Sequence, residues 1–207
     1  MSGRDWLAPL TGVLFFVLAV ARFMIVPYPP IATEASVDEM VTFFEDVGDR
    51  VFIASLVQSW AAAMFLLFAA VLYKAMRAAG AHASAIGMMA GAVVFTAGTT
   101  LDATIYAAAE RAMDVSPVAM QTLLAFYDLD WFPATTGTFV FLVSWGAGII
   151  RHGVLPAWMG WVMAIAGLQS LSPYYVTGTV ALAVAMLAVL VASIQLTRGA
   201  LKAPVAA

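Results

Sequence analysis

Six stretches of mainly apolar residues run along this chain of 207 residues, and polar residues separate them. A helix needs about 20 such residues to cross a hydrocarbon core about 30 Å thick, and lipid offers no water to satisfy an exposed backbone. The pattern therefore predicts an all-α fold, a polytopic membrane bundle of six transmembrane helices that forms a single domain over residues 1–207. The predicted spans are residues 6–26, 51–73, 84–109, 131–150, 157–172 and 175–197, of which 157–172 is the weakest.

The two long connections between these spans carry helix signals of their own. Ser36 and Glu39 have the spacing of a capping box, and apolar residues then recur at helical spacing as far as Val47. Ser116 and Pro117 form a second helix start, which an apolar stripe follows. The residues of this stripe are Met120, Leu123, Leu124 and Tyr127. We expect each connection to fold as a short amphipathic helix on the outer side of the bundle.

The positions of lysine and arginine indicate the orientation of the bundle. With both termini inside, six of the nine basic residues lie on the cytoplasmic side, and Arg22, Arg50 and Arg111 lie towards the outside. The positive-inside rule then predicts a multi-pass protein of the cell (plasma) membrane with both termini in the cytoplasm. Residues 19–21 match an Ala-x-Ala signal-peptide cleavage site, but the apolar run continues to Val26, so we expect the first span to stay as an anchor.

Composition narrows the classes of function. Hydrophobic residues make up 64% of the chain and charged residues 10%, whereas a soluble domain has about 25% charged residues. With 9 lysines and arginines and a net charge of -3, we expect membrane lipids around the chain and no nucleic-acid partner. The chain has no cysteine, and its two histidines, His82 and His152, fall in predicted cytoplasmic loops. We therefore expect no metal site, no cofactor and no catalytic residues.

Polar side chains are concentrated in the outer halves of the predicted spans. Ionisable groups at membrane depth are costly and suggest a functional site, although a polar network can also serve only to hold helices together. The candidate residues for a ligand site or buried polar network are Arg22, Gln58, Ser59, Thr99, Asp102, Tyr106, Thr135 and Gln169. The sharpest expectation is a direct, buried ion pair between Arg22 and Asp102, because both residues lie near the outer ends of their spans. The alternative is that Arg22 reaches up to the outer headgroups.

Three classes of function remain open at this point. The first is a non-enzymatic protein whose outward-facing polar cavity binds, senses or transports a small or amphipathic ligand. The second is an accessory or scaffolding subunit of a larger membrane complex, with a membrane protein partner docked at Gly87–Gly91, although packing within the bundle explains these glycines better. The third, which has least support, is an enzyme that acts on lipid through Asp102 or Glu110.

Two sequence motifs resemble those of a known group of proteins. The first runs from Ser36 to Arg50, and the second is Arg151-His152-Gly153-Val154-Leu155-Pro156-Ala157-Trp158-Met159-Gly160-Trp161. Together they resemble a broad family of actinobacterial multi-pass integral membrane proteins of unknown function. The chain departs from that family at Ala157, where an arginine is usual. The resemblance implies the architecture and no activity.

Overall fold

The computed structural model describes residues 7–30, 34–129, 131–171 and 175–202, and the regular structure in these ranges is all helical. A 3₁₀ turn, η1 (Ala8–Leu10), precedes α1 (Thr11–Ile25). The other helices are α2 (Val37–Val47), α3 (Arg50–Ala78), α4 (His82–Met113), α5 (Pro117–Tyr127), α6 (Trp131–His152), α7 (Ala157–Ser170) and α8 (Tyr175–Lys202).

Helical segments of this chain are long and apolar enough to cross a membrane, as the hydrophobic pattern predicts. In the described part of the chain these are Ala8–Ile25, Arg50–Ala78 and His82–Met113, together with the stretch Pro117–His152, to which α5 and α6 contribute. Leu182–Arg198, a part of α8, is a shorter apolar helix. The weak span predicted at 157–172 corresponds to α7, which has 14 residues. At 1.5 Å per residue α7 is about 21 Å long, which is less than the thickness of a hydrocarbon core.

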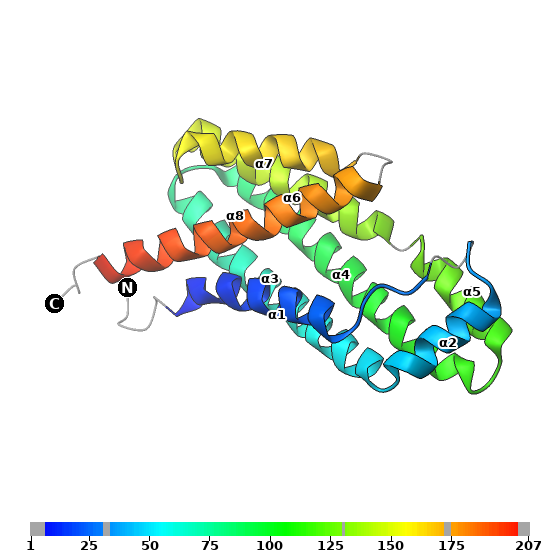
Figure 1. Cartoon of the computed structure of the whole chain (residues 1–207). Helices are drawn as coiled ribbons and strands as arrows, with labels where there is room; N and C mark the ends of the chain where they lie inside the picture. The colour runs from blue at the N-terminus through cyan, green and yellow to red at the C-terminus, as the bar shows by residue number, and fades with distance from the viewer. Residues whose placement is uncertain (1–6, 31–33, 130, 172–174, 203–207) are drawn as a thin grey trace.

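The long helices lie side by side, and the two short ones close one end of the bundle. α1, α3, α4, α6, α7 and α8 run along the length of the molecule, and α2 and α5 lie together at one end, which we call the α2–α5 end (Figure 1). α1 begins and α8 ends at the opposite end (Figure 1). α4 packs against α3, α5 and α6, whereas α8 packs against α7 and α1.

Both predicted short helices form, and their caps are those expected from the sequence. The Ser36 hydroxyl accepts from the Glu39 N–H while the Glu39 carboxylate accepts from the Ser36 N–H, which completes the capping box of α2. The Ser116 hydroxyl accepts from the Ala119 N–H at the start of α5. The apolar faces of the two helices meet in one buried cluster at the α2–α5 end. This cluster includes Met40, Phe44, Tyr106, Met120, Leu124 and Tyr127.

Glycines bring α4 and α6 into close contact. A Cβ atom added to Gly91 would lie 2.8 Å from the carbonyl oxygen of Gly137, and one added to Gly98 would lie 2.7 Å from the backbone nitrogen of Ala134. A Cβ atom at Gly87 would lie 2.5 Å from Ser144 Oγ. The Gly87–Gly91 face therefore packs within the bundle, as favoured from the sequence, and small residues allow the backbones to approach.

Candidate functional site

Arg22 lies in the last turn of α1 and is buried, with 3% of its surface exposed. The next residues explain one of its contacts. In a helix, a carbonyl group accepts from the N–H four residues further along the chain. Pro29 and Pro30 have no N–H, so the carbonyl groups of Ile25 and Val26 cannot accept such hydrogen bonds. The Arg22 guanidinium turns towards this end, where Nη1 donates to the Val26 carbonyl oxygen at 3.0 Å.

Gln58 of α3 connects Arg22 to Asp102 of α4. Arg22 Nε donates to Gln58 Oε1 at 2.9 Å, and Gln58 Nε2 donates to Asp102 Oδ2. The same nitrogen donates to the carbonyl oxygen of Thr99 at 3.2 Å. One carboxamide therefore offers its acceptor to the cation and its donor to the carboxylate, an arrangement in which each hydrogen bond polarises the other.

This arrangement corrects the direct Arg22–Asp102 ion pair expected from the sequence. The two residues do share one buried network, but Gln58 lies between them. The reason is the direction of the guanidinium: its Nη1 is committed to the Val26 carbonyl group, and Nε is left to face α3. The ion pair within 4.0 Å that the described residues do form joins Arg111 to Glu110.

Three aromatic rings surround the Arg22 guanidinium. Its central carbon lies 5.0 Å from the ring centroid of Tyr28, 5.4 Å from that of Phe23 and 5.5 Å from that of Tyr106. These distances fall within the range of cation–π attraction, which is stronger where water is excluded. The Tyr106 hydroxyl donates to the Pro27 carbonyl oxygen at 3.3 Å, so the same ring also holds the chain that leaves α1.

Tyr106 also connects this site to the two short helices, α2 and α5. Its ring centroid lies 5.3 Å from that of Tyr127 in α5 and 5.8 Å from that of Phe44 in α2. Both short helices therefore rest on a residue that contacts the arginine. A displacement of α2 or α5 would change the packing around the guanidinium.

One nitrogen atom of the Arg22 guanidinium has no hydrogen-bond partner in the described part of the chain. Nη2 is buried and has no hydrogen-bond acceptor among the residues that the structure describes. A buried donor without an acceptor costs about 1–3 kcal/mol, and more when it is charged, so such an atom calls for an explanation. Among the described residues, Nη2 is therefore the atom of the Arg22 guanidinium to which the protein supplies no acceptor.

The remaining sequence candidates do not join this network through the hydrogen bonds described. Ser59 Oγ donates to the Ser55 carbonyl oxygen within α3, and Thr135 Oγ1 donates to the Phe132 carbonyl oxygen within α6. Gln169 is exposed on α7. Thr99 takes part through its backbone only. A polar residue in a span can therefore satisfy itself on its own helix, which sequence position does not reveal.

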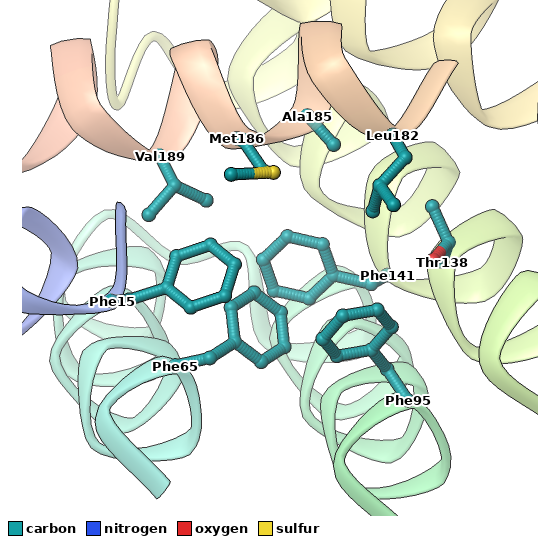
Figure 2. Close-up of a pocket in the computed structure, with 9 residues that line it drawn as sticks. All are labelled: Phe15, Phe65, Phe95, Thr138, Phe141, Leu182, Ala185, Met186 and Val189. Carbon is teal, nitrogen blue, oxygen red and sulfur yellow. The ribbon is translucent and has the colours of Figure 1, made fainter. Parts of the chain in front are cut away.

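A layer of aromatic side chains lies two helical turns from Arg22, Gln58 and Asp102, on the side away from the α2–α5 end. Phe15, Phe65 and Phe95 are each seven residues from Arg22, Gln58 and Asp102 on the same helices, about 10 Å along each axis. With Phe141 of α6 these rings line a small apolar cavity of about 20 Å³, which α8 covers. Figure 2 shows the four rings gathered beneath Leu182, Ala185, Met186 and Val189 of α8. The volume admits about one water molecule, and an apolar lining of this kind stays dry.

Three aromatic residues at or next to the site were not predicted from the sequence. Phe23 follows Arg22 on α1, Tyr28 lies in the extended segment after α1, and Tyr127 is predicted only as part of the apolar stripe of α5. The prolines after α1 carried a usable signal, because carbonyl groups without helical donors favour an arginine one turn earlier. Nothing in the sequence marked the two tyrosines, since their rings reach the site from other elements.

Comparisons with protein-family models, curated proteins and solved structures find no match to this chain. Among the residues described, no group of three or more histidine, aspartate and glutamate side chains could hold a metal ion.

Proposed function

We propose that this chain is a six-span protein of the plasma membrane with both termini in the cytoplasm, related in architecture to the actinobacterial proteins that its motifs resemble. The start of α1 and the end of α8 lie at the same end of the bundle, which supports an even number of crossings (Figure 1). The α2–α5 end would then face outwards, and α7 would cross with local thinning of the bilayer.

The proposed role is non-enzymatic: the protein binds a small or amphipathic ligand at Arg22, as a sensor or a transporter. The observation that carries this proposal is the buried Nη2 atom, which lacks an acceptor among the described residues. A carboxylate or phosphate oxygen would complete the guanidinium, because these groups match its geometry. The aromatic layer about 10 Å below Arg22 supports a ligand that also has an apolar part, for which the side chains of α8 would have to move.

The test is thermal unfolding of the purified protein in a mild detergent with amphiphiles of equal chain length. We expect an alkyl phosphate or carboxylate to raise the melting temperature, and an alkyl trimethylammonium to leave it unchanged. A ligand at 100 times its Kd stabilises by about 2.7 kcal/mol, a rise of about 5–10 °C for a protein of this size.

Arg22→Lys and Arg50→Lys form a matched pair for this experiment. Arg50 is an exposed arginine at the same end, and its guanidinium donates to the Val47 and Asp46 carbonyl oxygens. Both variants keep the net charge, but only the first removes the planar donor group from the site. The proposal fails if the anionic amphiphiles give no shift, or if Arg22→Lys retains a shift as large as that of Arg50→Lys.

The alternative role is an accessory subunit of a larger membrane complex. The observation that favours it is an open, apolar groove of about 560 Å³ on the sides of α3 and α4 that face away from the bundle. Residues such as Tyr73, Ile86 and Val93 line this groove. Extraction in a gentle detergent followed by native mass spectrometry separates the two roles. A stoichiometric protein partner would favour the subunit, and a bound amphiphile on a single chain would favour the ligand-binding role.

A further inference from the structure

α5 has two different faces, and the inner one is already accounted for. Met120, Leu124 and Tyr127 are buried against α4 and the end of the bundle. They belong to the stripe that its sequence predicts, whose fourth member, Leu123, is partly buried. The opposite face of α5 points away from the bundle.

This outward face of α5 is also apolar. Val115, just before the helix, is 86% exposed, Val118 is 67% exposed, Phe126 is 62% exposed, and Leu129, just after the helix, is 59% exposed. At 100° per residue these side chains fall within one sector of about 80°. The helix itself contains no charged residue. Soluble surfaces rarely expose a continuous apolar patch of this kind without a partner.

The polar side chain in the same sector donates its hydrogen bond within its own helix. Thr122 is exposed, and its hydroxyl donates to the carbonyl oxygen of Val118 in its own helix, at 2.9 Å. Its hydrogen-bonding capacity as a donor is therefore used without water. The outward face of α5 consequently offers no donor that needs a polar neighbour.

α2 provides an internal comparison, because it has the same length and an opposite outward face. Both helices have 11 residues, and both bury their inner faces in the same cluster. The outward face of α2 carries Asp38, Glu39, Thr42, Glu45 and Asp46, all of them exposed. The free energy needed to remove an ionised carboxylate from water is large, so the outward face of α2 has to lie in the aqueous phase.

We infer that α5 is an interfacial helix whose outward face, Val115 to Leu129, lies in the lipid of the bilayer, while α2 at the same end lies in water. The occupant is lipid because the face continues to Phe132, which is 55% exposed at the start of α6, and the stretch Pro117–His152 that contains both is apolar enough to cross a membrane. An uncharged helix with an apolar outward face is favoured at the boundary between headgroups and acyl chains. The inference depends on insertion of the bundle in a membrane, and it does not depend on the ligand at Arg22.

The absence of cysteine from the chain makes this inference directly testable. Thr122→Cys and Thr42→Cys are matched variants: each threonine is the sixth residue of its helix, is exposed, and donates to the carbonyl oxygen four residues earlier at 2.9 Å. Each variant is labelled with an environment-sensitive fluorophore in nanodiscs of phosphatidylcholine. Quenching is measured with aqueous iodide and with lipids that carry a nitroxide in the upper acyl chain.

We expect the label at position 122 to emit at shorter wavelength, to lose most of its intensity to the lipid nitroxide and to resist iodide. The label at position 42 should show the opposite pattern. Val118→Cys repeats the measurement on the same face if labelling at position 122 disturbs the helix. Equal quenching of both labels by iodide would overturn the inference, because α5 would then lie in water. Protection of the label on α5 from both quenchers would also overturn it, since a second copy or another protein would then cover this face.

Discussion

Replacement of Gln58 by leucine tests whether the buried bridge stabilises the bundle. The side chain accepts from Arg22 Nε and donates to Asp102 and to the Thr99 carbonyl oxygen, so three interhelical hydrogen bonds are lost at once. Leucine has a similar volume, and a change in packing should therefore contribute little.

The expected loss follows from the number and kind of these bonds. Interhelical hydrogen bonds in membrane proteins average about 0.6 kcal/mol, so three of them amount to about 2 kcal/mol. Two of the three involve charged groups, and hydrogen bonds to charged groups contribute about 1.5–3 kcal/mol each when they are desolvated. The two estimates together lead us to expect that Gln58→Leu lowers the free energy of unfolding by about 2–6 kcal/mol.

The assay is reversible unfolding in mixed micelles, followed by the fluorescence of the six tryptophans. Gln169→Leu is the matched control, because Gln169 is exposed on α7, and we expect its effect to be near zero. A double-mutant cycle with Arg22→Leu should show that the two losses are not additive, with a coupling of about 1–2 kcal/mol. If Gln58→Leu costs no more than Gln169→Leu, or if the cycle is additive, the bridge has no energetic role.

Three further predictions concern the rest of the bundle. Gly91→Ala should lower the free energy of unfolding by about 1–3 kcal/mol, because the new Cβ atom would lie 2.8 Å from the Gly137 carbonyl oxygen and push α4 away from α6. Phe65→Ala should cost about 3–5 kcal/mol in the same assay, since its ring meets three other phenylalanine rings within 5.2 Å. The Ser36 N–H and hydroxyl hold the pKa of Glu39 below its usual value, so the cap stabilises α2 fully above the unfolded pKa of about 4.3 and is lost as the pH falls through the lower folded value. The protection factors of the amide hydrogens in the first turn of α2, which are corrected for the intrinsic pH dependence of exchange, should decrease over that fall. Glu39→Gln should remove this decrease, because glutamine also completes a capping box.

The sequence by itself determined the local features of this protein. Apolar runs of sufficient length predict the long helices, and the structure has a helix in each of the predicted stretches. The start of α2 at Ser36 and that of α5 at Ser116 are also readable, since a cap depends on residues within one turn of each other. The same holds for the glycine face of α4, because helical periodicity alone puts its members on one side.

Only the tertiary structure decided which polar residues meet. Arg22, Gln58 and Asp102 come from three helices, and whether two of them touch depends on the rotation and offset of each helix, to which the hydrophobic pattern is insensitive. A position near the end of a span constrains depth to within a turn or so, which was enough to place Arg22 and Asp102 in one network and too little to separate a direct pair from a bridged one. The division of roles between α2 and α5 has the same origin. Both sequences encode a short helix with an apolar stripe, but the outward side of each became defined only when its inner face packed against Tyr106.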